Sequence, residues 1–336
     1  MPDLINAAKV AKIAILGARG YVGIELIQLL DQHPKVKLQA VFSRSYAGKH
    51  VQEVVSGFSD AELIYQAGDF SALQAMSLDV LFLALPDGIA REHDELWVSM
   101  AQNKGTVIID LSADYRFDDT WIYGQPETYA DKLKQAKLIA NPGCYATGIQ
   151  MGLRPLLPYL QDADNDVPTA FGISGYSGAG TTPSDKNNPA RLADNLLAYK
   201  STGHTHEKEV SHVLQHTIRF MPHVAAHFRG IHLTLSGKLN LTLTERELYE
   251  LFNNFYAEMP LIEVQQQPPE IQQISRKHQL IVGGFSTSDT EHGHFVLNVC
   301  LDNLMKGAAT QAVQNMNLAC ASSHHTQPLE GLNYEQ

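Results

Sequence analysis

The chain has 336 residues, which is long for a single hydrophobic core and suits two domains. It carries 25 Lys and Arg against 36 Asp and Glu, a formal net charge of −11, and has no basic run. This balance argues against a nucleic-acid partner or binding to an anionic membrane surface. A few well-placed arginines can still bind a phosphorylated metabolite, because they act locally.

The cysteines and the first residues indicate the compartment. The 3 cysteines are far apart and form no Cys-x-x-Cys pair, which argues against a disulfide framework or a zinc ribbon. Residues 1–6 lack the basic and apolar regions of a signal peptide. No apolar run reaches the ~20 residues needed to cross a bilayer. We therefore expect a cytoplasmic protein without a membrane segment.

The first predicted unit is a strand, a glycine turn and a helix. Residues 9–16 are mostly apolar, as in a strand buried on both faces, and lead into the turn 17–23 with the pattern G-x-x-G-x-x-G. The apolar positions of residues 24–30 then recur at helical spacing. This order predicts a dinucleotide site, although the commoner fingerprint is G-x-G-x-x-G and such turns also occur for packing alone.

The end of the second predicted strand favours NADP. Residues 36–42 are followed by Ser43, Arg44 and Ser45. An NAD site usually has an Asp or Glu here for the ribose 2′-hydroxyl, whereas hydroxyls and a guanidinium suit a 2′-phosphate. The alternative is that Arg44 is only a solvated loop residue.

Two further apolar strands, residues 79–85 and 106–111, end in Pro, Gly, Ser and Asp. In doubly wound sheets such ends form the ligand crevice. Arg116 follows the second strand, so it is a candidate to bind an anionic group. A structural ion pair with Asp114 or Asp118 is the competing interpretation.

Cys144 is the candidate nucleophile. Residues 137–140 predict a short buried strand, Pro142 and Gly143 a sharp turn, and residues 145–153 a helix. Unpaired N–H groups and the positive end of the dipole at a helix start favour a thiolate. The alternative is packing, since cysteine is among the most buried residue types.

The chain changes character after this cysteine. Residues 231–236 and 295–301 alternate between apolar and polar, as in an antiparallel sheet with one dry face. Residues 174–180 form a second glycine-rich turn and residues 181–195 an exposed loop or lid. The other predicted elements are a strand over 169–173 and helices over 205–215, 245–258 and 304–318, the last with one apolar face. We therefore expect Cys144 at the junction of two domains.

A nicotinamide cofactor and a cysteine together suggest that the thiolate accepts an acyl group, and that hydride reduces the resulting thioester. His204 and His206 are candidates for the proton carrier, at the start of a helix that Thr205 would cap. The alternative is that both are solvated loop histidines. A metal is not expected, because no further ligand at a matching spacing completes a site with these histidines.

Five segments occur together in the order that is typical of one family. They are residues 17–23, 110–116, 141–147 (NPGCYAT), 174–180 and the helix start at His204. The chain resembles N-acetyl-gamma-glutamyl-phosphate reductases, of the aspartate-semialdehyde dehydrogenase superfamily, from about residue 12 to residue 318.

The resemblance implies NADPH-dependent reduction of N-acetyl-L-glutamyl 5-phosphate to the 5-semialdehyde in arginine biosynthesis, with Cys144 as nucleophile. One of His204 and His206 would be the acid/base, with Glu209 a candidate orienting partner. The residues implied for cofactor binding are Gly17, Ala18, Arg19, Gly20, Tyr21, Val22, Ser43, Arg44, Pro86, Ser112, Gly178 and Asn317. The residues implied for substrate binding are Arg116, Asn141, Ser174 and Gly175.

The implied fold is α/β. A Rossmann-type parallel domain (residues 1–147 and 305–336) is joined to an α+β domain like that of glyceraldehyde-3-phosphate dehydrogenase, with a mostly antiparallel sheet (residues 148–304). The resemblance also implies a homodimer or homotetramer acting on a small acyl-phosphate.

Two departures from the family pattern leave alternatives open. Thr181 and Thr182 stand where a basic residue is common, and Thr205 stands where Arg is common. A substrate phosphate or carboxylate would then contact Arg116, Lys186 or Arg191, or the acyl group differs. The alternatives are an aspartate-semialdehyde dehydrogenase, an aminoadipyl-phosphate reductase and, in another class, a non-catalytic NADP-sensing protein.

Overall fold

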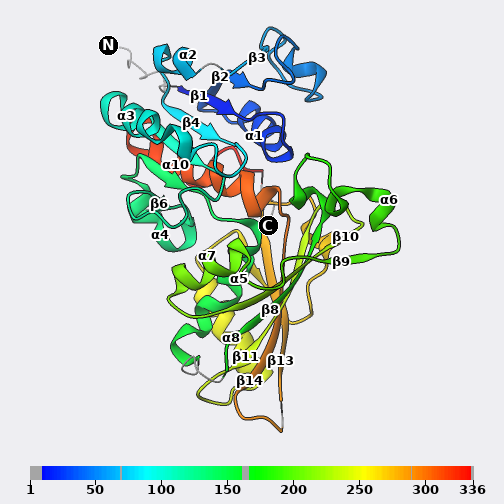
Figure 1. The fold of residues 1–336 in the computed structure, drawn as a ribbon. Coiled ribbons are helices and arrows are strands. Elements are labelled where there is room, and N and C mark those ends of the chain that lie inside the picture. The colour runs from blue at the N-terminus through cyan, green and yellow to red at the C-terminus, as the bar shows by residue number, and fades with distance from the viewer. Residues whose placement is uncertain (1–9, 69, 161–165, 289, 334–336) are drawn as a thin grey trace. The chain divides into compact units, whose positions relative to one another are not determined.

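The computed structural model describes residues 10–68, 70–160, 166–288 and 290–333. The chain divides into two compact units (Figure 1). The first contains the residues up to Pro142 together with Ala309–Asn333, and the second contains Gly143–Ala308. The first boundary thus lies just before Cys144 and the second just after Ala308.

The first unit is built on a seven-stranded parallel sheet with the order β3-β2-β1-β4-β5-β7-β6. The strand order reverses between β1 and β4, and in such sheets the ligand crevice lies at the carboxyl ends beside this point. The predicted Rossmann-type sheet is confirmed. The strands are β1 Ala11–Leu16, β2 Val36–Phe42, β3 Tyr65–Gln66, β4 Val80–Leu83, β5 Val107–Asp110, β6 Ile122–Tyr123 and β7 Leu138–Ala140.

The local sequence accounts for these elements. All residues of β4 and β5 are buried, because helices cover both faces of a parallel sheet. The helix after β1 starts at Tyr21, inside the glycine turn rather than after it, because Gly20 already has the extended backbone of an N-cap. The described part of the first strand starts at Ala11, and Lys9 lies outside the described residues. The helices are α1 Tyr21–Asp31, α2 Phe70–Ala75, α3 Asp94–Lys104, α4 Pro126–Leu133 and α10 Thr310–His324.

The C-terminal helix α10 belongs to the first unit, where it contacts α1, α4 and β5 (Figure 1). The sequence predicted one helix over residues 304–318 with a single apolar face. Instead, a π-helical turn, Met305–Ala309, precedes α10, and polar residues such as Gln311 and Asn315 are fully buried. Periodicity missed this because a buried amide can bind a partner distant in the sequence, as when Asn315 Nδ2 donates to Gly124 O at 2.8 Å.

The second unit is a seven-stranded mixed sheet with the order β12-β13-β14-β11-β8-β10-β9. Four neighbouring pairs are antiparallel, whereas β8 with β10 and β12 with β13 are parallel. The predicted mostly antiparallel sheet is confirmed. The strands are β8 Thr169–Gly175, β9 Leu196–Ala198, β10 Arg219–Ala225, β11 Ile231–Lys238, β12 Ile262–Val264, β13 Leu280–Thr287 and β14 His294–Leu301.

Helix α5, which begins at Cys144, lies directly on the core face of this sheet. A Cβ added to Gly148 would be 2.5 Å from Leu233 Cδ1, and one added to Gly152 would be 2.2 Å from Leu235 Cδ1. The two glycines therefore let α5 approach these leucines closely, and a larger residue at either position would push the leucine side chains aside. The helices are α5 Cys144–Leu153, α6 Pro189–Leu192, α7 Thr205–Leu214, α8 Glu245–Tyr256 and α9 Ile271–Ile274.

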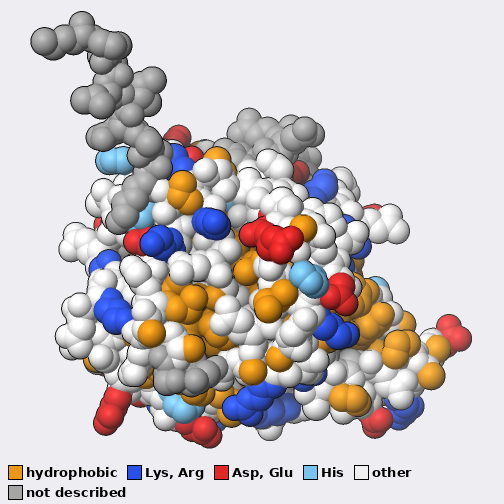
Figure 2. All heavy atoms as spheres, turned by 90° about the horizontal axis from the view of Figure 1, so that it is seen from above, with side chains coloured by type: hydrophobic (Ala, Val, Ile, Leu, Met, Phe, Trp, Pro, Cys, Tyr) orange, Lys and Arg blue, Asp and Glu red, His pale blue; other side chains and the backbone are white. Residues whose placement is uncertain are grey.

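Two further expectations concern surface segments. The predicted exposed loop over residues 181–195 is mostly exposed, but it contains the short helix α6, whose Leu192 is fully buried. Figure 2 shows acidic and basic side chains interspersed with apolar ones on the face in view. In the part of the chain that the structure describes, no helix is both long and apolar enough to span a membrane.

Candidate active site

The three glycines of the turn after β1 differ in what they do. Gly17 has φ +80°, and a Cβ there would lie 2.1 Å from Ala84 O, so the turn can pack against the end of β4 only with glycine. A Cβ on Gly23 would lie 2.8 Å from Ala18 Cα. Gly20, the N-cap of α1, has no such neighbour closer than 3.9 Å. Gly17 and Gly23 are therefore needed for packing, while Gly20 leaves open space at a helix N-terminus, where a phosphate is favoured.

The other predicted residues of this turn differ in how far they are exposed. Ala18 is buried and its N–H donates to Phe42 O at 3.0 Å, whereas Arg19 is exposed and Tyr21 and Val22 are half-buried. Beyond β2, Ser43 is buried and Arg44 and Ser45 are exposed at the same carboxyl edge of the sheet. The exposed guanidinium is available to a ligand there.

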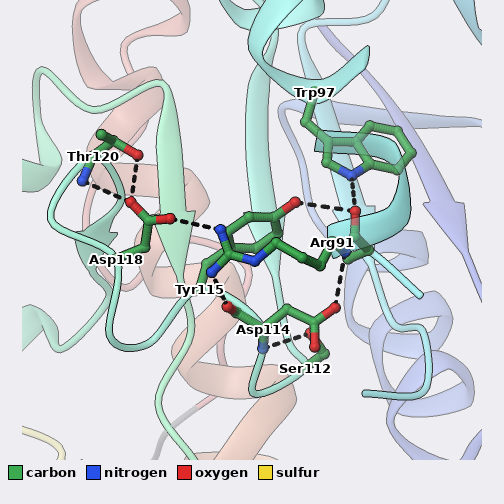
Figure 3. A network of polar contacts seen from close by, with 8 residues as sticks. Arg91, Trp97, Ser112, Asp114, Tyr115, Asp118 and Thr120 are labelled. Carbon is green, nitrogen blue, oxygen red and sulfur yellow. Dashed lines mark hydrogen bonds and ion pairs between the residues drawn. The ribbon is translucent and has the colours of Figure 1, made fainter. Parts of the chain in front are cut away.

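The loops after β4 and β5 are braced to each other by Asp114 and Arg91 (Figure 3). The Asp114 carboxylate accepts from the N–H of Gly88 at 2.6 Å and from the N–H of Arg91 at 3.0 Å. Arg91 Nη2 donates to Asp114 O at 2.5 Å and its Nη1 to Asp118 at 2.7 Å. The guanidinium also lies 4.4 Å from the centre of the Tyr115 ring. These contacts hold the loops that carry Pro86 and Ser112.

Asp110, the last residue of β5, is fully buried. Burial raises its pKa from 3.8 to about 6, against the opposing effect of the Ser112 hydroxyl, which donates to Oδ2 at 2.7 Å. Ser112 is itself buried.

Arg116 and Asn141 take part in the polar interior of the first unit. Arg116 Nε donates to Asn141 O at 3.0 Å and its Nη2 to Leu111 O at 3.1 Å. Asn141 Oδ1 accepts from Asn315 Nδ2 at 2.9 Å. Asp114 and Asp118, the alternative ion-pair partners considered for Arg116, both contact Arg91.

Asn317 is a structural residue in the first unit. Its side chain is fully buried, with Oδ1 3.0 Å from His33 Nε2 and Nδ2 donating to Glu330 O at 2.9 Å. The amide thus joins the C-terminal segment to the chain just after α1. The family pattern identified the helix, but the direction of this side chain depends on a segment that the pattern does not cover.

Cys144 is the first residue of α5 and is partly buried. Its N-cap is Gly143, whose backbone is extended. The Gly143 N–H donates to Oε1 of the fully buried Glu209 at 2.9 Å, and Thr147 Oγ1 donates back to Gly143 O at 3.0 Å. Glu209, predicted as a partner for a histidine, therefore holds the turn before the cysteine.

The two histidines occupy different positions at the start of α7. His204 is the N-cap, and its Nδ1 accepts from the His206 N–H at 3.1 Å, so the cap is His204 and not Thr205 as predicted. Burial, with the charges of Lys200 and Lys186, lowers the His204 pKa from 6.5 to about 4. The His206 ring lies 5.0 Å from that of His204 and 5.8 Å from that of Tyr145, centre to centre.

Tyr145, Tyr199 and Lys186 lie around these two histidines. The sequence named Lys186 as a candidate substrate contact but singled out neither tyrosine. Burial, with the charges of Tyr199 and Cys144, raises the pKa of Tyr145, and burial with the charge of Cys144 raises the pKa of Tyr199. The Tyr199 ring is 5.8 Å from His204 and 4.8 Å from Lys186 Nζ. A tyrosine and basic residues in a polar loop just before a histidine pair were the available signal.

The second glycine-rich turn also belongs to the second unit. Ser174 Oγ donates to Gly175 O at 2.8 Å, and a Cβ on Gly178 would lie 2.8 Å from Ser174 Oγ. A Cβ on Gly175 would lie 2.6 Å from the backbone of Phe228. Close packing against backbone therefore requires glycine at position 175, whereas a side chain at position 178 would force the Ser174 hydroxyl to move. Among the described residues, no group of three or more His, Cys, Asp or Glu side chains is placed to hold a metal ion.

Comparison with known proteins identifies both units. Residues 12–136 match the semialdehyde dehydrogenase NAD binding domain, and residues 144–303 match the semialdehyde dehydrogenase dimerisation domain. The chain therefore has a domain for a nicotinamide cofactor followed by one whose family assembles into oligomers.

Solved structures support the fold. Aspartate semialdehyde dehydrogenase II from Vibrio cholerae superposes with a TM-score of 0.74 at 17% identity, covering 94% of this chain and 99% of that one. The enzyme from Candida albicans, solved with NADP, gives a TM-score of 0.70 at 18% identity, with 94% and 99% covered.

Sequence relatives are much closer. The N-acetyl-gamma-glutamyl-phosphate reductase of Xanthomonas campestris is 47% identical over 309 residues, which cover 91% of this chain and 95% of that protein. The mitochondrial protein arg-6 of Neurospora crassa is 45% identical over 316 residues; the match covers 92% of this chain and only 35% of that longer protein. The chain belongs to the N-acetyl-gamma-glutamyl-phosphate reductase family of semialdehyde dehydrogenases.

Proposed function

We propose that this protein reduces N-acetyl-L-glutamyl 5-phosphate to N-acetyl-L-glutamate 5-semialdehyde and phosphate with NADPH, in arginine biosynthesis. The observation that carries the proposal is Cys144 at the start of α5, in a cluster with His206 and Tyr145. The 47% identity with the Xanthomonas campestris reductase favours the glutamyl substrate over the aspartyl one.

The chain's own residues supply the acyl-transfer steps. The Cys144 thiolate, favoured at a helix N-terminus, attacks the acyl carbon, and the C–O bond to phosphate breaks to leave a thioester. Glu209 occupies the Gly143 N–H, so we assign the oxyanion contact to the Cys144 N–H. The thioester carbon would then be reduced by hydride, which is the chemistry that a nicotinamide supplies when bound. The carbon–sulfur bond then breaks, giving the aldehyde and restoring the thiolate.

We assign the acid/base role to His206. A proton carrier works best with a pKa near the operating pH. His204 does not meet that condition, because its pKa is about 4 and its Nδ1 accepts a hydrogen bond at the helix start. We therefore treat His204 as the cap that orients the first turn of α7, on which His206 stands.

We propose NADP as the cofactor. The open N-terminus of α1 at Gly20 suits the pyrophosphate, and Arg44 at the end of β2 suits a 2′-phosphate. Arg19, Tyr21, Val22, Pro86 and Ser112 remain proposed contacts. Gly17 and Ala18 would shape the turn, since their N–H groups donate to Phe42 O. The described contacts of the Asn317 amide go to His33 and Glu330 O.

The cofactor assignment has a direct test. Arg44→Asp should weaken NADPH binding by at least about tenfold while changing NADH binding little, since it removes a charge-assisted contact to the 2′-phosphate only. Lys49→Asp, a charge reversal further along the same loop, is the matched control. Equal losses for both cofactors would refute the assignment.

For the substrate we propose that Lys186 contacts its phosphate or carboxylate. It lies beside Tyr199 and its charge acts on His204, whereas the described contacts of Arg116 go to backbone carbonyls. Ser174 and Gly175 remain proposed substrate contacts through the turn that carries them.

The reaction itself is tested by turnover of N-acetyl-glutamyl phosphate and aspartyl phosphate with NADPH. The former should be the better substrate by kcat/KM, and Cys144→Ala should abolish turnover while retaining NADPH binding. Cys300→Ala, at a buried cysteine under α9, is the matched control and should stay active. Substantial activity in Cys144→Ala would refute the thioester mechanism.

We further propose that the protein is a homodimer or homotetramer assembled through the second sheet. On the strand face turned away from the core, Ile173, His223 and His232 are neighbours in register and only half-buried. Ile173→Glu should dissociate the oligomer in sedimentation experiments. Phe255→Glu, at an apolar residue 43% exposed on α8, should leave its mass unchanged.

A further inference from the structure

Asp302, directly after β14, is fully buried and holds four donors with its carboxylate. Oδ1 accepts from the N–H of Leu304 at 2.8 Å and of Met305 at 3.2 Å. Oδ2 accepts from the Arg276 N–H at 2.7 Å and from Arg229 Nη1 at 3.2 Å. The side chain therefore caps the π-helical turn on one side and is fixed by a buried guanidinium on the other.

The backbone of Asp302 also contacts the centre of the π-helical turn. Its carbonyl accepts from the Gly307 N–H at 2.9 Å. A Cβ added to Gly307 would lie 2.7 Å from Cys144 Cβ and 3.2 Å from Cys144 Cα. The turn therefore packs its bare backbone against the nucleophile, and a residue with any side chain would displace it. Isolated π turns of this kind are frequent at functional sites.

Asn303 connects the same point to the glycine-rich turn after β8. Its Oδ1 accepts from the Gly230 N–H at 2.8 Å, and its Nδ2 donates to Ser177 Oγ at 2.9 Å. The residue is buried, as is Ser177. Asp302 and Asn303 thus connect three segments by hydrogen bonds: the π turn, the residue before β11, and the turn that carries the proposed substrate contacts.

We infer that Asp302 is a positioning residue for Cys144: by fixing the π turn through Gly307, it sets where the sulfur lies. This inference rests on the proposed function for its kinetic consequence. A displacement of about 1 Å from a productive geometry can cost about a hundredfold in rate, so a residue that touches no substrate can control turnover.

The test compares Asp302→Asn and Gly307→Ala with wild type in two assays. One is kcat and KM with the acyl phosphate; the other is the pH dependence of Cys144 alkylation by iodoacetamide, followed by mass spectrometry. Both variants should lower kcat at least about tenfold and change KM less than about threefold. Both should also shift the alkylation profile, because the thiol leaves its place at the helix start.

A matched control separates positioning from general destabilisation. Phe252→Leu alters the apolar core beside α8 and should lower the melting temperature while keeping kcat and the alkylation profile. If Asp302→Asn does not fold, Gly307→Ala decides alone, because it perturbs the contact with Cys144 without removing the buried ion pair. Wild-type kcat and alkylation in a folded Asp302→Asn or Gly307→Ala would overturn the inference. Alkylation needs no substrate, so a failure of the proposed function would be seen separately, as absence of turnover in the wild type.

Discussion

The different roles assigned to the two histidines lead to a sharp prediction. His206→Asn removes the proposed acid/base, whereas His204→Asn replaces one helix cap with another, since Asn is among the best N-cap residues. The Asn oxygen can accept the His206 N–H as His204 Nδ1 does at 3.1 Å. The two single substitutions are chemically identical and lie two positions apart.

The expected magnitudes follow from the pKa. With a pKa of about 4, His204 carries a proton in only about one molecule in a thousand at pH 7, so it contributes little as an acid. His206→Asn should therefore lower kcat by about 10²–10⁴-fold, the usual contribution of general acid–base catalysis. His204→Asn should stay within about fivefold. His204→Ala, which lacks the cap, should lose about 1 kcal/mol of stability.

The assay is steady-state turnover followed by NADPH absorbance over a range of pH, with melting temperatures to confirm folding. The dependence of kcat on pH in His204→Asn should match that of wild type, because His206, the proposed acid/base, is still present. A loss in His204→Asn as large as that in His206→Asn would refute the assignment and transfer the proton to the capping histidine.

Three other predictions test separate parts of the molecule. Gly17→Ala should lower the melting temperature, because φ is +80° at this position and the added Cβ would lie 2.1 Å from Ala84 O. Gly20→Ala should melt like wild type but bind NADPH less tightly in titration calorimetry, because its Cβ would enter the open space at the helix N-terminus. The pKa of Asp110 is raised in the folded state from 3.8 to about 6, so its contribution to stability is present below pH 4 and lost as pH rises to 6. In denaturant titrations, the free energy of unfolding of Asp110→Asn relative to wild type should therefore be higher at pH 8 than at pH 4, by up to about 3 kcal/mol. An equal difference at the two pH values would contradict this. Lys186→Gln should raise KM for the acyl phosphate at least about tenfold with Lys186→Arg largely restoring it, and an unchanged KM would exclude the contact.

The parts of the fold that the sequence predicted correctly are those set by local patterns. The apolar strands, the glycine turn before α1 and the alternating strands β11 and β14 each follow from residues within one short window. The boundary errors also have local causes. His204 caps α7 because its backbone is extended and its Nδ1 faces the next turn, although Thr205 is the commoner type of cap.

The site depended more on contacts between distant residues. Arg116 and Asn317 stand where a ligand contact was expected, yet their described contacts go to backbone groups and to the C-terminal segment. A residue pattern gives the position of a polar side chain along an element. It does not say whether a buried carbonyl or amide elsewhere needs that side chain as its partner.

The surroundings of Cys144 show why a motif alone cannot describe the site of a proposed nucleophile. The segment that contains it supplies the turn and the helix start, but Glu209 comes from α7 and Gly307 from the π turn before α10. One holds the Gly143 N–H and the other leaves room for the cysteine itself. Because both contacts come from outside residues 141–147, changing either should move the sulfur without altering the motif. We therefore expect the reactivity of Cys144 to depend on Glu209 and Gly307 as well as on residues 141–147, and variants at these two distant positions test this.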